Sequence, residues 1–85
     1  MNIQLRFFAS VREALGVSHE AVTLPSEVTT VGAVRALLVA RGGAWAEVLG
    51  EGRALRMAYN QVMCAPGTPL QENAEVAFFP PVTGG

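Results

Sequence analysis

The sequence contains two short strand-like segments, then a single long helical segment, then three more strand-like segments, and few small folds have this order. The strand-like segments are residues 3–8, 21–24, 55–59, 62–64 and 75–79. Residues 31–41 carry apolar side chains at helical spacing, and Thr30 is placed to cap the start of this helix. The predicted order is therefore β-β-α-β-β-β, with minor helical turns.

This order predicts an α+β fold in which one main helix packs across one face of a small mixed sheet. The first and last strands are expected to lie side by side at the centre of the sheet as a parallel pair. Such a layout is typical of β-grasp, or ubiquitin-like, folds. The 85 residues are enough for one domain. We expect the β-grasp domain to span residues 1–79 and an extended tail to span residues 80–85.

Local signals mark where the helical segments begin and end. The sequence Ser10-Val11-Arg12-Glu13 has the pattern of a capping box, which predicts a short helix that opens there and stops at Gly16. Gly42-Gly43 predicts the end of the main helix. Residues 45–49 continue at helical spacing and predict a brief further helical segment.

Composition argues against several classes of function. With Cys64 as its single cysteine, the chain cannot form a disulfide framework. One cysteine and one histidine, His19, also argue against a metal site. We interpret Cys64 as a buried strand residue rather than a persulfide carrier, and His19 as a surface residue in a turn. The net charge of −1 provides no basic stripe for nucleic acid, and no apolar run is long enough for a membrane span. We therefore expect a cytoplasmic, metal-free protein that binds neither nucleic acid nor membranes.

The chain ends in Pro80-Pro81-Val82-Thr83-Gly84-Gly85, directly after a strand-like segment. Two prolines fix φ and cannot donate to a sheet, so they end the strand and hold the exit segment extended. Five further residues reach about 16–18 Å from Pro80, and two terminal glycines can enter a channel too narrow for a side chain. The tail is therefore suited to deliver its α-carboxyl group into a pocket of another protein. The alternative interpretation is an ordinary frayed terminus.

Two Phe-Phe dipeptides carry a geometric prediction, because neighbouring residues of a strand point to opposite faces of the sheet. Phe7 and Phe78 share faces with the apolar residues of their strands, so they are expected in the core. Phe8 and Phe79 then face away from the helix and lie near each other, and Met63 is placed to join them. The alternative is a pair of rim aromatics covered by a loop. Our interpretation is an exposed docking patch at the root of the tail.

Sequence motifs at both ends resemble those of the molybdopterin synthase small subunit (MoaD) family. The C-terminal motif is Phe78-Phe79-Pro80-Pro81-Val82-Thr83-Gly84-Gly85, preceded by Glu75-Val76-Ala77. Residues 5–13 match the first strand and following turn of the same family, and Asn60-Gln61 also fits. A Gly-Gly end alone would also suit the thiamine-pathway carrier or a ubiquitin-like modifier.

The resemblance implies a sulfur carrier that is not itself catalytic. An adenylating enzyme similar to the ubiquitin activators would use ATP to activate the last glycine, and a sulfurtransferase would convert it to a thiocarboxylate. The large subunit of the synthase would receive the tail and supply the active-site groups. Sulfur would pass to cyclic pyranopterin monophosphate in a complex of two small and two large subunits. No cofactor would be bound by the chain itself.

The resemblance also implies a role for particular residues. Gly85 would carry the acyl-adenylate and then the thiocarboxylate. The residues implied to give the tail access are Gly84, Thr83, Pro81 and Pro80. The residues implied to contact partners are Phe8, Met63 and Phe79, which would bind the large subunit, and Arg12, which would pair with an acidic site on the activating enzyme.

Several alternatives stay open at this point. Arg12 is equally compatible with a solvated helix arginine. The chain could be a sulfur carrier for thiamine thiazole or nucleoside thiolation, because the tail chemistry would be the same. A ubiquitin-like interaction module or a covalent modifier is the remaining alternative.

Overall fold

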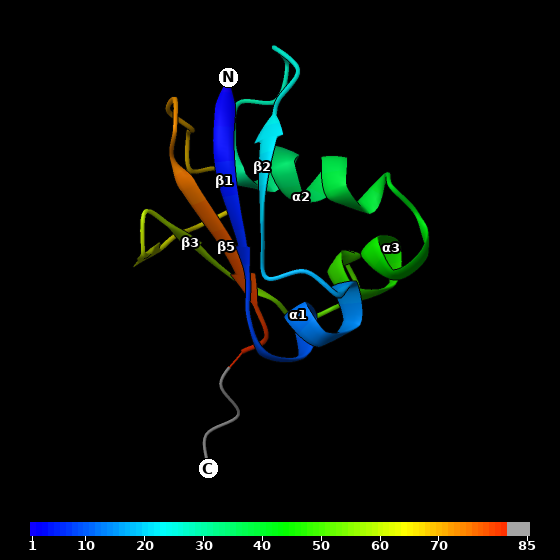
Figure 1. The fold of residues 1–85 in the computed structure, drawn as a ribbon. Coiled ribbons are helices and arrows are strands. Elements are labelled where there is room, and N and C mark those ends of the chain that lie inside the picture. Colours follow the sequence, from blue (N-terminus) through cyan, green and yellow to red (C-terminus); the bar gives the residue numbers. More distant parts are fainter. Residues whose placement is uncertain (82–85) are drawn as a thin grey trace.

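A computed structural model describes residues 1–81, which form one mixed sheet with helices packed against it (Figure 1). The strands are β1 (Asn2–Phe7), β2 (His19–Thr23), β3 (Arg56–Tyr59), β4 (Val62–Met63) and β5 (Glu75–Phe79). The helices are α1 (Ala9–Leu15), α2 (Val31–Val39) and α3 (Gly43–Leu49). The strand order is β2-β1-β5-β3-β4, and β1 and β5 are parallel. The predicted parallel pair at the centre of the sheet is confirmed.

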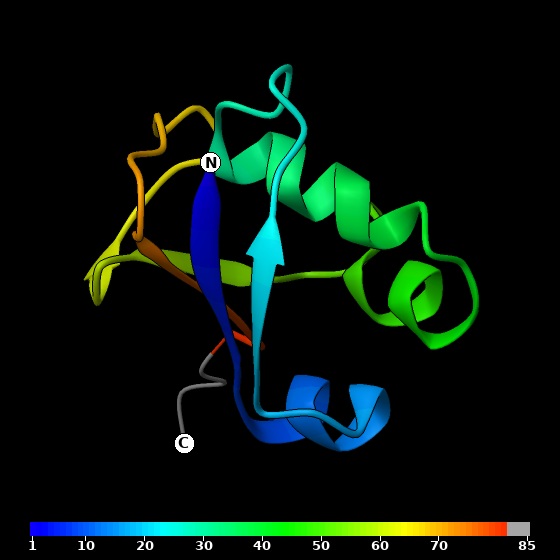
Figure 2. The ribbon, with the colours of Figure 1, turned by 45° about the horizontal axis from the view of Figure 1, so that its top comes forward.

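The core lies between the sheet and the helices. Leu5 pairs with Val76 and Phe7 with Phe78 across the parallel strands, and all four side chains are buried. Helix α2 lies across the sheet and α3 follows at its end (Figure 2). The helix residues buried against the sheet are Val11, Val31, Val34, Leu38 and Leu49. Because strand residues alternate, the residues next to those of the core face away from the helices.

Helix α2 begins at the predicted residue, Val31, and ends at Val39 instead of the predicted Arg41. The Thr30 hydroxyl accepts a hydrogen bond from the Ala33 backbone N–H at 3.2 Å, so the predicted N-cap is confirmed. The helix ends at Val39, and Gly42 is the N-cap of α3 with φ +76°. The Gly42-Gly43 pair therefore starts the third helix rather than stopping the second. Gly42 combines this positive φ with a ψ of −172°, a conformation that glycine adopts readily because it has no Cβ.

The predicted capping box before α1 is wrong. The helix begins at Ala9 with Phe8 as its N-cap, and no side chain caps it. Ser10 lies inside the first turn, so its hydroxyl is not placed to cap the helix. Strand β1 runs to Phe7, and Ala9 adopts φ +53°, which turns the chain from strand to helix within two residues. The predicted stop at Gly16 is confirmed, with φ +77°.

An ion pair joins edge strand β2 to the turn that follows α2. Arg41 donates to both carboxylate oxygens of Glu20, at 3.0 and 2.6 Å. Its guanidinium carbon lies 4.4 Å from the centre of the Trp45 ring, which meets the Phe7 ring in a T-shaped contact. The hydrogen bond from Arg41 holds the pKa of Glu20 below its ordinary value. The pair therefore stabilises the fold only while Glu20 is ionised.

Replacing this carboxylate should change how stability depends on pH. Because the folded-state pKa of Glu20 is lowered, its contribution is present above the ordinary glutamate pKa and is lost as pH falls through the folded value. We expect Glu20→Gln to lower the free energy of unfolding by about 0.5 kcal/mol at neutral pH, since the pair is partly exposed. In urea unfolding, the difference in the free energy of unfolding between the parent and the variant should be smaller at about pH 3 than at about pH 7.

The control for this experiment is Glu27→Gln. Glu27 is exposed in a turn and forms no ion pair with other residues of the 1–81 segment. Its replacement should change stability little at either pH. A deficit of Glu20→Gln that is equally large in acid would contradict the role of the charged pair.

Candidate docking surface at the root of the tail

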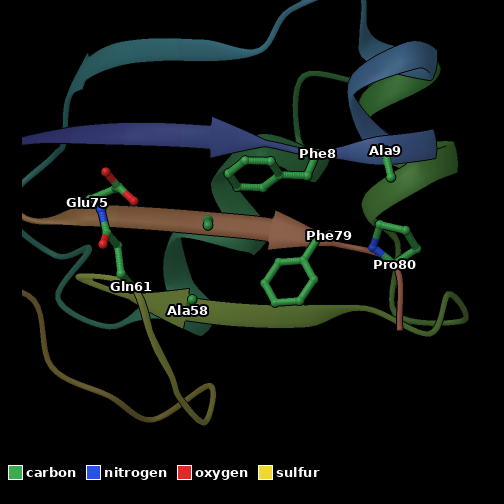
Figure 3. Close-up of a pocket in the computed structure, with 8 residues that line it drawn as sticks. Phe8, Ala9, Ala58, Gln61, Glu75, Phe79 and Pro80 are labelled. Atoms are coloured by element: carbon green, nitrogen blue, oxygen red, sulfur yellow. The ribbon is translucent and has the colours of Figure 1, made fainter. Parts of the chain in front are cut away.

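An apolar hollow of about 400 Å³ lies on the face of the sheet that the helices leave open (Figure 3). Phe8 and Phe79 flank it, Ala58 and Ala77 form its floor, and Pro80 lies at one end. This is the point where β5 ends and the tail begins. A partner side chain that entered the hollow would therefore hold the domain directly beside the tail.

The two aromatic rings lie where strand alternation predicts them. Phe7 and Phe78 are buried on the helix side, and Phe8 and Phe79 point to the open face. The rings of Phe8 and Phe79 meet edge to face, with centroids 6.4 Å apart. Phe8 keeps 41% of its surface exposed, although it is a large apolar residue. The predicted position of the two rings, close together on the open face, is confirmed, but only Phe8 is exposed and Phe79 is half-buried.

The floor of the hollow depends on two small residues from distant parts of the sequence. Ala58 of β3 pairs with Ala77 of β5, and both are buried even though they lie on the open face. A methyl group at each position leaves space between the flanking rings. Sequence reasoning missed both alanines, because a small residue in a strand gives no sign of the space above it.

Met63 lies on the same face, beyond the hollow. It pairs with Ala58 across the β3–β4 hairpin, so the two side chains share a face. Met63 is 54% exposed, and it does not line the hollow. The predicted patch of three residues is therefore an aromatic pair that flanks a hollow, with an exposed methionine on the neighbouring strand.

The end of the hollow away from Pro80 is polar. Glu75 lies there, and its carboxylate is 4.0 Å from the Arg6 guanidinium. The Arg6 guanidinium carbon also lies 5.5 Å from the centre of the Phe8 ring. Both charged groups are partly exposed, so the pair adds little to stability. These groups instead give the hollow a polar boundary on one side.

A second hollow, of about 410 Å³, lies beyond Pro80. Ser10 and Val11 of α1 line it together with Arg53 and Leu55 from the segment before β3. Pro80 borders both hollows, so the root of the tail lies between them.

Arg35 of α2 holds the segment that precedes β3. Its guanidinium donates to the carbonyl oxygens of Leu49 and Gly50, both at 2.6 Å, and to that of Arg53 at 3.1 Å. Leu49 is the last residue of α3, where helix carbonyls lack partners within the helix, and Gly50 and Arg53 lie in the segment that follows. Sequence reasoning missed this contact because the partners are main-chain atoms 14 to 18 residues away.

The remaining predicted site residues are Arg12 and those of the tail. Arg12 is exposed on α1 and lines neither of the two hollows. Pro80 and Pro81 are half-buried. The predicted roles of Thr83, Gly84 and Gly85 fall outside the described residues and stay predictions.

Two single residues differ from their predicted places. Cys64 is half-buried and packs against the core just after β4, rather than inside a strand. His19 is exposed as predicted, but it is the first residue of β2 rather than a turn residue.

Among residues 1–81, no cluster of three metal-ligating side chains is present. No helix of this part of the chain has the length and apolar character to cross a membrane.

Residues 5–85 match the ThiS family. The chain belongs to the ThiS family. Two curated relatives of this ThiS-family chain are the molybdopterin synthase sulfur carrier subunits of Escherichia coli (strain K12) and Haemophilus influenzae. They are 42% and 40% identical to it over 83 residues, which cover 98% of this chain and 99% of each relative. The predicted resemblance is confirmed.

Solved structures share the fold of this ThiS-family chain. The crystal structure of SAMP1 from Haloferax volcanii has a TM-score of 0.79 and 27% identity, with all of both chains covered. A complex of subunits 1 and 2 of molybdopterin-converting factor from Helicobacter pylori matches with a TM-score of 0.70 and 24% identity, again over all of both chains. The β-grasp, ubiquitin-like fold predicted from the order of strands is confirmed.

Proposed function

We propose that this chain is the sulfur carrier subunit of a molybdopterin synthase and acts in molybdopterin biosynthesis. The observation that carries the proposal is the 42% identity, over nearly the whole of both chains, to a subunit of that name. An open apolar hollow at the root of a Gly-Gly tail supports it. A docking surface and a deliverable carboxyl group are the two parts that such a carrier needs.

The tail would carry sulfur on Gly85. An α-carboxyl group ordinarily has a pKa of about 3.3–3.7, so at neutral pH it is an anion that resists nucleophiles. An adenylating partner would join this carboxylate to AMP from ATP and release pyrophosphate. Adenylation removes the negative charge of the carboxylate and installs AMP as a leaving group. A sulfide-level sulfur atom from a sulfurtransferase would then displace AMP. The product is a thiocarboxylate, whose ionised sulfur is a strong nucleophile in the way that thiolates are.

The large subunit of the synthase would supply the site where the sulfur leaves. Its surface would enter the hollow between Phe8 and Phe79, and the tail would run from Pro80 into its active site. Transfer of sulfur to cyclic pyranopterin monophosphate and attack of water on the acyl carbon would return Gly85 to a carboxylate. A dithiolene contains two sulfur atoms, so two rounds of donation are needed for each product. An assembly of two small and two large subunits provides two such tails.

The experiment that tests this function has two steps. Purified chain is incubated with an adenylating enzyme, ATP and a sulfur source, and its intact mass is measured. The expected result is a gain equal to the difference between one sulfur and one oxygen atom. The product is then mixed with the large subunit and pyranopterin precursor. A chain that gains sulfur and yields no dithiolene would be a carrier for another acceptor, and a chain whose mass never changes would not be a carrier.

A further inference from the structure

The turn between β3 and β4 contains an unusual residue choice. Asn60 and Gln61 form the two-residue connection of this hairpin, with φ of +48° and +69°. Hairpin turns of this kind favour Asn-Gly, because the second residue must adopt a left-handed conformation that glycine reaches without strain. Asparagine tolerates this conformation, whereas glutamine rarely adopts it. The chain therefore keeps a strained glutamine where glycine would fit better.

The stabilising contacts of the turn belong to Asn60. Its side-chain Oδ1 accepts a hydrogen bond from the Glu75 backbone N–H at 2.8 Å, and its own N–H donates to the Glu75 carbonyl at 2.8 Å. These bonds fasten the hairpin to the central strand β5. The side-chain amide of Gln61 forms no hydrogen bond with any other residue of the 1–81 segment. The fold itself gives no reason for the glutamine.

The side chain of Gln61 lines the docking hollow. It extends toward Glu75 at the polar end, opposite Pro80, and the residue is exposed (Figure 3). The floor and the aromatic flanks of the hollow are apolar, so they attract an apolar side chain without fixing its direction. A primary amide at the edge has both a donor and an acceptor, which match the two polar groups of a peptide unit.

We propose that Gln61 is a specificity-determining residue of the docking surface, whose amide pairs with a main-chain peptide group of the large subunit. The same partner segment would place an apolar side chain between Phe8 and Phe79. Burial of that side chain would supply affinity, and the amide contact would set the register of the partner and so the direction in which the tail enters. This inference rests on the proposed function, because it takes the large subunit as the occupant of the hollow.

The test compares thermal stability with affinity in one variant. Gln61→Gly relieves the left-handed strain, so the melting temperature should rise by about 4 °C. The affinity for the purified large subunit, measured by isothermal titration calorimetry, should fall about tenfold because the polar contact is lost. A change that stabilises the carrier and weakens its complex separates a binding role from a structural one.

Asn73→Gly is the matched control. Asn73 is exposed, has φ +65° in the turn before β5, and does not line the hollow. Its replacement should raise the melting temperature slightly and leave the affinity unchanged. A second variant, Gln61→Glu, keeps the length of the side chain and removes its donors. It also places a second carboxylate beside Glu75, so it should melt below the parent temperature and bind more weakly.

The outcomes separate this inference from the function on which it rests. If the parent binds the large subunit and both Gln61 variants bind equally well, the role of Gln61 is wrong and the proposed function stands. A Gln61→Gly variant that is not stabilised would remove the strain argument and overturn the inference as well. If the parent chain itself does not bind the large subunit, the proposed function fails together with the inference.

Discussion

One alanine added after Gly85 should abolish sulfur transfer while the fold and the docking stay intact. The extra residue moves the acyl carbon by about 3.3–3.6 Å along the tail and adds a side chain at its tip. Misplacement of a reacting group by about 1 Å can reduce a rate roughly 100-fold, so a loss of at least that size is expected. The measurement is dithiolene formation from pyranopterin precursor by the carrier and the large subunit, after incubation with adenylating enzyme, ATP and a sulfur source.

Two controls belong to this experiment. The extended chain should keep the melting temperature of the parent, because the described core lies within residues 3–78. It should also keep its affinity for the large subunit through the hollow beside Pro80. Undiminished dithiolene formation, with the extra alanine shown by intact mass to be retained, would contradict the proposed role of Gly85.

Phe8→Ala should weaken binding to the large subunit by about 30-fold, which corresponds to about 2 kcal/mol. The Phe8 ring flanks the hollow and packs against Phe79, so its removal takes away one wall of the docking surface. Stability should fall much less than for a core phenylalanine, because 41% of the residue is already exposed. Calorimetry with the purified large subunit gives the affinity, and urea unfolding gives the stability.

Val62→Ala is the matched control for Phe8→Ala. Val62 is also an exposed apolar residue, with 68% of its surface accessible. It pairs with Tyr59, which in turn pairs with the buried Val76, so by register it belongs to the opposite face of the sheet. Its replacement should leave the affinity unchanged. Equal losses in the two variants would mean that binding depends on exposed apolar surface in general rather than on the hollow.

Much of the fold was predictable because it follows from local properties of the chain. Alternation in the first and last strands placed Phe7 and Phe78 inside and Phe8 and Phe79 outside, since neighbouring strand residues necessarily point to opposite faces. The cap at Thr30 was also visible, because its hydroxyl bonds a backbone N–H only three residues away. The order of these segments was then enough to predict the parallel central pair.

The turn into α1 required the tertiary structure. The capping-box pattern at residues 10–13 was a valid local signal, but β1 continues to Phe7 and the left-handed turn at Ala9 starts the helix earlier. Pairing of β1 with β2 and β5 fixes where the strand ends, and those partners lie far along the sequence.

The family, the order of the elements and the two faces of the first and last strands could be predicted without coordinates, because these depend on motifs and on neighbours along the chain. Two features became visible only once the chain was folded: Ala58 lies beside Ala77 beneath the two rings, and Gln61 reaches the edge of the same hollow. Strand register explains the difference. The hollow is formed by side chains from separate strands, and only pairing between those strands brings them together.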